Sequence, residues 1–273
     1  MSKVWFVTGS SRGLGRSFVE AALSRGDKVA ATARKVETLH DLVVKYGDAV
    51  LPLELDVTSK AAVFGSVEQA RQHFGRVDVI VNNAGYGLSG AVEELAEQQL
   101  RDQFETNFFG AVWVVQAAVP HLREQGGGHI IQISSVAGVS GFPLGAAYCA
   151  SKWALEGLSE SLAQEVAGFG IKVTLVEPGG YATDGNAGAD HAQPDPRYDG
   201  LRETFAAYAK TLDLGDPAAA GQAILKLADA DNPPLRVFFG NQGNAIAQQV
   251  YADRLETWSD WQDLALEAHG RTP

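Results

Sequence analysis

The sequence has few of the features that mark secreted, metal-binding or nucleic-acid-binding proteins. Its 273 residues include one cysteine, Cys149, which excludes an intrachain disulfide, and no Cys/His spacing indicates a structural zinc site. The net charge is −11, from 22 basic and 33 acidic residues, and no run of five or six lysines or arginines occurs. Because affinity for a phosphate backbone comes mostly from clustered cations, we expect no nucleic-acid partner and no metal site.

Long apolar runs are also missing. The first residues, Met1 to Thr8, lead directly into a glycine-rich segment and lack the apolar stretch and cleavage site of a signal peptide. No span of 18 apolar residues follows, so no membrane partner is expected. Together with the single cysteine, these absences predict a soluble cytoplasmic protein.

Short β-rich runs alternate with longer segments of helical periodicity, which is typical of βαβ units. Seven runs predict strands: Val4 to Thr8, Lys28 to Ala33, Val50 to Leu55, Val77 to Asn82, His129 to Ser134, Ile171 to Glu177 and Leu235 to Gly240. Helices are predicted at about 13–25, 59–74, 97–124, 148–168 and 216–230. We predict an α/β fold: a single doubly wound, Rossmann-type domain with a seven-stranded parallel sheet.

The predicted domain spans residues 1–273, with a cofactor-binding and catalytic core over 1–180, a substrate lid over 181–215 and a C-terminal helix over 245–269. Residues 184–200 show little periodicity, and a loop of that length in a compact domain is more often functional than incidental. Apolar residues from Ala247 to Ala265 recur at three- and four-residue steps, which predicts an amphipathic helix. We expect Trp258 and Trp261 on this stripe to be core residues, with a substrate-contacting wall or an interface as the alternative.

A glycine-rich turn follows the first predicted strand. The segment Thr8 to Gly15 has the spacing G-x-x-x-G-x-G, which differs from the commoner G-x-G-x-x-G dinucleotide fingerprint. Between a strand and a helix, such a turn aims backbone N–H groups and the positive end of the helix at an anion, usually a pyrophosphate. An ordinary tight turn is the alternative.

The end of the second predicted strand favours a phosphorylated ribose. A carboxylate there would accept hydrogen bonds from a 2′-hydroxyl, but the residues are Ala33, Arg34 and Lys35. Arg34 can pair with a 2′-phosphate, and Arg12 could close the same pocket. We therefore predict NADP(H) in preference to NAD(H), the alternative being that both arginines are solvated surface charges.

A tyrosine and a lysine share one face of the helix predicted over 148–168. Tyr148 and Lys152 are four residues apart, so the ammonium can lie beside the phenol, stabilise the phenolate and bring its pKa toward the working range. Tyr148 could then exchange a proton with a carbonyl or alcohol oxygen that Ser135 holds by a hydrogen bond. For so short a motif, a surface pair is the alternative.

Taken together, these residues resemble the short-chain dehydrogenase/reductase family over roughly residues 3 to 240. Thr8 to Gly15 matches the family's T-G-x-x-x-G-x-G, and Asn82 to Gly85 matches its N-N-A-G. Asp56-Val57 resembles its adenine-contacting dipeptide, and Pro178-Gly179 with Thr183 matches the P-G-x-x-x-T segment that holds the nicotinamide. The resemblance implies a catalytic tetrad of Asn107, Ser135, Tyr148 and Lys152. It implies cofactor binding by Gly9, Ser11, Arg12, Gly13, Leu14, Gly15, Arg34, Asp56, Val57, Asn83, Ala84, Gly85, Tyr148, Lys152, Pro178, Gly179 and Thr183.

The resemblance also implies a mechanism, in which hydride passes between the nicotinamide and a substrate carbon while Tyr148 transfers the proton. Lys152 would bind the nicotinamide ribose and lower the tyrosine pKa, and a backbone kink at Asn107 would hold a water. The protein orients and polarises, and the hydride chemistry belongs to the cofactor.

The resemblance implies that the substrate pocket is lined by the stretch from Val139 to Ala146 and by the lid. Its expected lining, which is mostly apolar, consists of Gly141, Phe142, Leu144, Tyr181 and Phe205. We therefore expect a small or medium hydrophobic ketone or secondary alcohol.

Members of this family associate through their fourth and fifth helices, so Phe108, Phe109 and Trp113 imply a homodimer or homotetramer. The main alternative function is a non-catalytic NADP(H)-binding regulatory or redox-sensing protein. A nucleotide-sugar epimerase or dehydratase would need a larger C-terminal domain.

Three further features of the sequence are assigned plain structural roles. Cys149 is expected to pack, Asp190-His191 to form an exposed turn, and Glu93-Glu94 to begin a helix.

Overall fold

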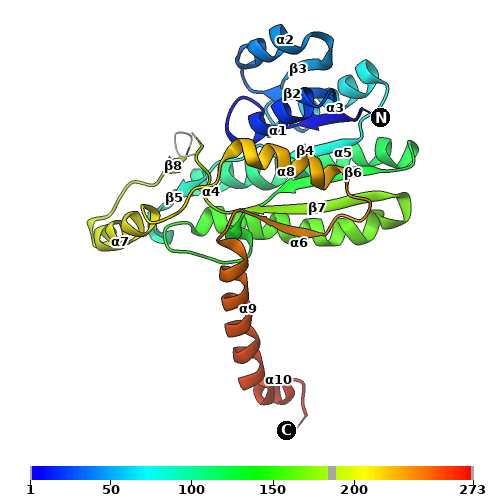
Figure 1. Ribbon diagram of the computed structural model, residues 1–273. Coiled ribbons are helices and arrows are strands. Elements are labelled where there is room, and N and C mark those ends of the chain that lie inside the picture. Colours follow the sequence, from blue (N-terminus) through cyan, green and yellow to red (C-terminus); the bar gives the residue numbers. More distant parts are fainter. Residues whose placement is uncertain (1, 184–188, 272–273) are drawn as a thin grey trace.

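The computed structural model describes residues 2–183 and 189–271, which form a seven-stranded parallel sheet with helices on both faces (Figure 1). The strand order is β3-β2-β1-β4-β6-β7-β9, so the direction of strand addition reverses between β1 and β4. The strands are β1 (Val4–Val7), β2 (Lys28–Ala33), β3 (Val50–Glu54), β4 (Val79–Asn82), β6 (Gly128–Ile133), β7 (Ile171–Pro178) and β9 (Arg236–Phe239). The predicted fold class is confirmed, and ligands of such sheets bind at the carboxyl ends of the strands beside this reversal.

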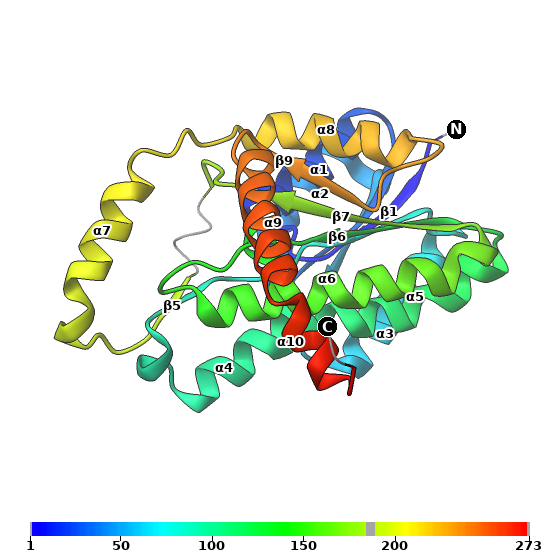
Figure 2. The same ribbon diagram turned by 90° about the horizontal axis from the view of Figure 1, so that it is seen from below.

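Two helical layers bury the two faces of the sheet (Figure 2). One layer contains α1 (Gly13–Ser24), α2 (His40–Tyr46) and α8 (Pro217–Asp229), and the other contains α3 (Lys60–Phe74), α5 (Gly110–Glu124) and α6 (Ala146–Val166). Within β1, Trp5 and Val7 join the core on the α1 side, while Val4 and Phe6 join the core on the α3 side. Both side-chain faces are therefore buried, which explains why the strands read as continuous apolar runs.

The long helix predicted over 97–124 contains an irregular turn. The chain forms α4 (Glu97–Phe104), a π-helical segment over Glu105–Phe109, and then α5. A π-helical turn fits an additional residue into the helix and often marks a functional site. Here it includes Asn107, where the resemblance implies a backbone kink.

The segment after β7 contains elements that the sequence did not predict. It includes β8 (Asp190–His191), which pairs with β5 (Leu88–Ser89), and α7 (Asp199–Ala209). Residues 184–188 of the predicted lid lie outside the described residues. Asp190 and His191 therefore belong to a short strand and not to a simple turn.

The C-terminal helix extends away from the body beyond the β9 edge of the sheet (Figure 1). It consists of α9 (Gly243–Asp260) and α10 (Gln262–Ala268), separated at Trp261. The expectation that Trp258 and Trp261 are core residues is wrong, because they are 63% and 64% exposed. The amphipathic period correctly predicts a helix, but the connection from β9 directs that helix outward.

Candidate active site

At two glycines of the turn between β1 and α1 there is no space for a side chain. Gly9 has a φ of +69°, and a Cβ there would lie 3.0 Å from the Cα of Ala84. At Gly15, a Cβ would lie 2.3 Å from both the Gly9 oxygen and the Asn83 Nδ2. These two glycines therefore allow the segment after β4 to approach the turn closely.

Asn83 fastens this segment to the turn. Its Nδ2 donates to the carbonyl oxygens of Thr8 (2.9 Å) and Gly9 (3.0 Å). In return, the Thr8 Oγ1 accepts from the backbone N–H groups of Asn83 (2.9 Å) and Ala84 (3.0 Å). The Asn83 side chain thus shapes the cofactor-binding turn from behind, a role that the sequence pattern did not distinguish from direct contact.

The beginning of α1 suits an anion. Gly13 has a φ of +59°, and within the described part of the chain no side chain caps the helix at Arg12. The N–H groups of the first turn therefore remain available, and Ser11 and Arg12 beside them are exposed. Arg34, which follows β2, is exposed. Burial raises the pKa of Tyr86, and the positive charge of Arg34 opposes that rise.

Asp56 and Val57 follow β3 but have different environments. The Asp56 Oδ1 accepts from the backbone N–H (3.0 Å) and hydroxyl (2.8 Å) of Thr58. Val57 is buried, and a Cβ on Gly110 would lie 2.7 Å from its Cγ2. Val57 thus packs at the junction of the π-helical segment and α5.

Asn107 connects the segment after β4 with α6. Its Nδ2 donates to the Tyr86 oxygen (2.9 Å) and the Ser151 Oγ (3.1 Å), and its Oδ1 accepts from the Tyr86 N–H (3.0 Å). Gly85 allows this approach, since a Cβ there would lie 3.1 Å from the Asn107 Oδ1 and 3.7 Å from the Lys152 Nζ.

Ser135, Tyr148 and Lys152 meet at the carboxyl end of β6. Ser135 lies two residues after the end of β6, accepts from the Ala137 N–H at 3.1 Å, and lowers the pKa of the neighbouring Tyr148 phenol. Lys152 is 5% exposed and donates to the Ile133 oxygen at 2.7 Å, with its Nζ 5.7 Å from the centre of the Tyr148 ring. The structure therefore brings the four predicted tetrad residues together, with Asn107 linked through Ser151 and Gly85.

The protonation states differ from the sequence-based expectation. Burial raises the pKa of Tyr148, and only the Ser135 hydrogen bond opposes that rise. Burial also lowers the pKa of Lys152 to about 8, against the charge of Glu156. The expected lowering of the Tyr148 pKa by Lys152 is absent from this structure, because the ammonium donates to a backbone carbonyl and desolvation of the phenolate dominates.

The segment after β7 closes one side of the crevice. The Gly179 N–H donates to the Phe239 oxygen at 2.9 Å, and the Ser135 Oγ lies 3.5 Å from the Pro178 oxygen. Thr183 lies at the glycine turn, since a Cβ on Gly13 would be 3.8 Å from the Thr183 Cβ. The P-G-x-x-x-T segment thus runs from Ser135 to the start of α1.

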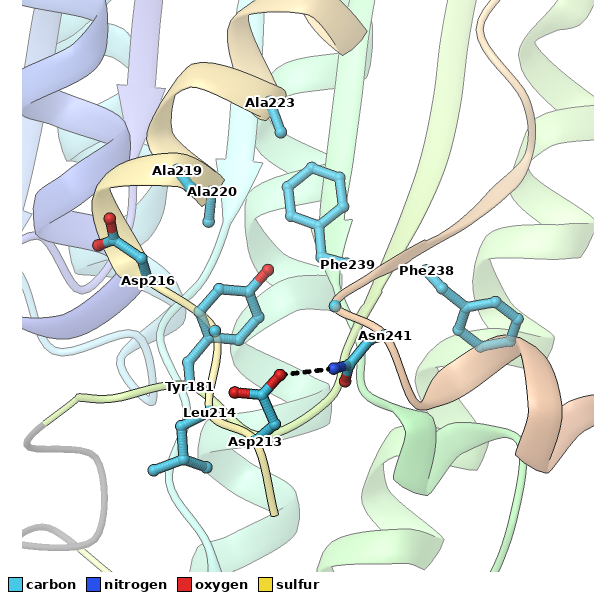
Figure 3. A pocket seen from close by; sticks show the side chains of 12 residues that line it. Tyr181, Asp213, Leu214, Asp216, Ala219, Ala220, Ala223, Phe238, Phe239 and Asn241 are labelled. Carbon is cyan, nitrogen blue, oxygen red and sulfur yellow. Dashed lines mark hydrogen bonds between the residues drawn. The ribbon is translucent and has the colours of Figure 1, made fainter.

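A neighbouring cavity of about 460 Å³ lies between the end of β9 and the start of α8 (Figure 3). Tyr181, which we expected to line the substrate pocket, lines this cavity together with Phe239 and Asp213. The cavity lining does not include Phe142 or Phe205, whose rings stack on each other with centres 5.8 Å apart. Leu144 is buried, and Cys149 is buried as expected.

Several charged residues near the site were not identified from the sequence. Glu94, assigned a plain role, accepts from the N–H groups of Ala91 (2.7 Å) and Asp195 (2.6 Å) and pairs with Arg202 of α7. Glu156 and Glu177 are also buried beside the tetrad. Glu177 could have been singled out from the sequence, because it is a charged residue at the end of an apolar strand.

No group of three or more His, Cys, Asp or Glu side chains in residues 2–183 and 189–271 could hold a metal ion. In the same ranges, no helix has the length and apolarity required to cross a bilayer.

Comparisons with known proteins agree with this geometry. An oxidoreductase of Botryotinia fuckeliana is 42% identical over 97% of this chain and 99% of its own length. A short-chain dehydrogenase from Streptomyces avermitilis matches with a TM-score of 0.92 at 39% identity, covering 98% of each chain, so most of α9 and α10 has a counterpart there. An alcohol dehydrogenase from Thermococcus sibiricus, solved with 5-hydroxy-NADP, matches with a TM-score of 0.74 at 25% identity, covering 88% of this chain and 96% of its own.

The family model described as short chain dehydrogenase matches residues 3–194, which include the glycine turn and all four tetrad residues. The chain therefore belongs to the short-chain dehydrogenase family of oxidoreductases.

Proposed function

We propose that the protein is an NADP(H)-dependent oxidoreductase that interconverts a small or medium hydrophobic ketone and the corresponding secondary alcohol. The observation that carries this proposal is the convergence, at the carboxyl ends of the strands, of a glycine turn suited to an anion with the half-buried Ser135 and Tyr148 and the buried Lys152. The turn suits a pyrophosphate, and the cluster suits proton exchange with an oxygen.

A nicotinamide dinucleotide fits the residues that are present. Gly9 and Gly15 let the segment after β4 pack against the turn, and the uncapped start of α1 offers N–H groups to a phosphate. When bound, the nicotinamide supplies the hydride acceptor or donor. The Thermococcus relative was solved with an NADP derivative, which supports the same cofactor class here.

The chain's own residues would manage the proton. In this structure the raised pKa of Tyr148 keeps its phenol protonated, which is the form that donates to a substrate oxygen during reduction. The Ser135 hydroxyl would hold that oxygen beside the phenol. Lys152 would orient the ribose.

Preference for NADP(H) rests on the exposed Arg34 after β2, together with Arg12 at the glycine turn. The hydrophobic substrate class rests on the Phe142–Phe205 stack and the buried Leu144.

We also propose one domain of 273 residues that acts as a cytoplasmic homodimer or homotetramer.

The experiment is Tyr148→Phe, assayed with NADPH against chemically varied ketones. Loss of the proton donor should lower turnover by about 10²–10⁴-fold and leave NADPH affinity unchanged. Tyr181→Phe is the matched control, because Tyr181 lines the neighbouring cavity, and it should retain activity. Substantial activity of Tyr148→Phe on every accepted ketone would contradict the assigned role.

The second candidate function is a non-catalytic NADP(H) sensor on the same fold. The observation that favours it is that Lys152 and Asn107 donate hydrogen bonds to groups of the protein itself. A complete absence of turnover is needed to choose it over the oxidoreductase. Tight NADPH binding by the natural sequence with no turnover across the whole ketone and alcohol panel would identify it.

A further inference from the structure

Three glutamates share one arginine beneath the candidate active site. Arg236, at the start of β9, donates through Nε to the Glu156 Oε2 at 2.9 Å and through Nη2 to the Glu160 Oε2 at 2.7 Å. Its Nε also lies 3.7 Å from the Glu177 Oε1. Glu156 and Glu177 are only 7% and 1% exposed, whereas Glu160 is on the surface.

Each of the two buried carboxyl groups has one oxygen that accepts no hydrogen bond from the described residues. Within the described residues, no donor reaches the Oε1 of Glu156 or the Oε1 of Glu177. The space is tight, since a Cβ on Gly138 would lie 3.2 Å from the Glu156 Oε1 and 2.7 Å from the Ser134 Oγ. Two buried carboxylates that share one arginine, each with an oxygen left without a donor, are costly, and protonating one of them provides a donor.

The electrostatic surroundings favour such a proton. Burial first, and then the neighbouring charge of Glu156, raise the pKa of Glu177 to about 7 against the opposing charge of Arg236. Burial also raises the pKa of Glu156, while the Ser134 hydroxyl, Arg236 and Lys152 oppose that rise. The charged groups that face the pair are therefore Arg236 from β9 and Lys152 and Glu160 from α6.

Glu156, Glu177 and the nearby Ser134 each adjoin a residue of the candidate site. Glu156 is one helical turn after Lys152 on α6, and Glu177 immediately precedes Pro178 at the end of β7. Ser134, in contact with this cluster, immediately precedes Ser135. The cluster therefore joins the three segments that carry the proposed catalytic and cofactor-holding groups.

We infer that Glu156 and Glu177 share one proton, and that this pair is a positioning device that holds β6, β7 and α6 in register beneath Ser135, Lys152 and Pro178. The shared proton is a property of the folded chain alone. Only its consequence for catalysis rests on the proposed function.

The pair makes stability depend on pH in a defined direction. A carboxyl whose folded-state pKa is raised binds more protons in the folded state than in the unfolded state. Its stabilising contribution is complete below the unfolded pKa and is lost as the pH rises through the folded value of about 7. Replacement by glutamine, which donates without titrating, should remove this dependence.

The test is the midpoint of thermal unfolding, Tm, of the full chain and of Glu177→Gln between pH 5 and pH 8. We expect the Tm of the natural sequence to fall relative to that of Glu177→Gln by roughly 3 °C per pH unit up to about pH 7. At pH 8, Glu177→Gln should be the more stable protein. Glu160→Gln is the matched control, since Glu160 bonds to the same arginine on the surface, and it should follow the natural sequence.

An ordinary ion pair of Arg236 with an ionised Glu177 predicts the reverse. Glu177→Gln would then be less stable than the natural sequence at pH 8 and would show the same pH dependence, which would overturn the inference. If Glu177→Gln does not fold, the infrared carbonyl band of a protonated carboxylic acid in the natural sequence decides instead. Its presence at pH 6 and loss by pH 8.5 supports the shared proton, and its absence at pH 6 overturns it.

The positioning role has a separate readout in the cofactor KM. The KM for NADPH should rise severalfold between pH 6 and pH 8 in the natural sequence and stay constant in Glu177→Gln, with kcat affected less. Identical KM profiles would overturn the positioning role. Because the unfolding measurement needs no cofactor or turnover, failure of the proposed function and failure of the shared proton are distinguishable.

Discussion

At the scale of single residues, the structure shows that several motif residues hold neighbouring segments of the chain in place. Asn83 uses its amide to hold the glycine turn, and Asn107 uses its amide to hold Tyr86 and Ser151. A sequence motif identifies such residues as important, but it cannot separate contact with a ligand from support of a neighbour. The same limit applies to Glu94, Glu156 and Glu177, whose partners lie far away in the sequence.

Arg34→Asp tests the cofactor preference at this scale. Loss of a charge-assisted pair with the 2′-phosphate, worth about 1.5–3 kcal/mol, should weaken NADPH binding by roughly 10- to 100-fold and leave NADH binding unchanged. Lys35→Asp makes the same charge change at the next exposed position and should have a smaller effect. Titration of both variants with each cofactor measures this, and unchanged discrimination would remove Arg34 from the assignment.

At the scale of elements, strands and long helices were predictable because each has a strong local signal. The seven strands of the main sheet appear within about two residues of their predicted bounds, since burial on both faces makes them apolar throughout. Elements fixed by distant contacts were not predicted, notably α7 and the β5–β8 pair. The family resemblance was enough to expect Asn107, Ser135, Tyr148 and Lys152 to lie together, whereas the pKa of Tyr148 could not be predicted, because it depends on burial.

Glu94→Ala tests how the segment over residues 190–209 is fixed to the core. Glu94 accepts two backbone N–H groups and pairs with Arg202, and these contacts hold the start of α7. Its removal should cost about 1–3 kcal/mol and accelerate hydrogen exchange at residues 190–202. Glu93→Ala is the matched control, because its pair with Arg197 is exposed, and it should change stability little. Equal exchange rates in both variants would show that Glu94 does not anchor this segment.

At the scale of the whole molecule, the C-terminal helices are separate from the core. Gly243 is the one buried residue of α9, and in the described part of α10 no residue is buried. Arg254 links α9 to the body through its cation–π contact with Trp153 and a hydrogen bond to the Val139 oxygen at 3.2 Å. The free energy of unfolding should therefore depend little on the distal part of these helices.

The double variant Trp258→Ala with Trp261→Ala tests this independence. Because both side chains are exposed, each substitution should change the free energy of unfolding by less than about 0.5 kcal/mol. Trp5→Ala, which removes a fully buried ring bonded to Asp27, should cost about 3–5 kcal/mol. Urea unfolding of both variants measures the difference, and a large loss in the double variant would show that these rings are covered in solution.

The outward helix also determines what an optical measurement of this protein reports. Of the five tryptophans, Trp153, Trp258 and Trp261 are 42%, 63% and 64% exposed, and all three lie on α9–α10 or against it. The intrinsic ultraviolet emission of the chain is therefore weighted toward its outermost helices, and quenching by a dissolved iodide salt would monitor that extremity separately from the sheet.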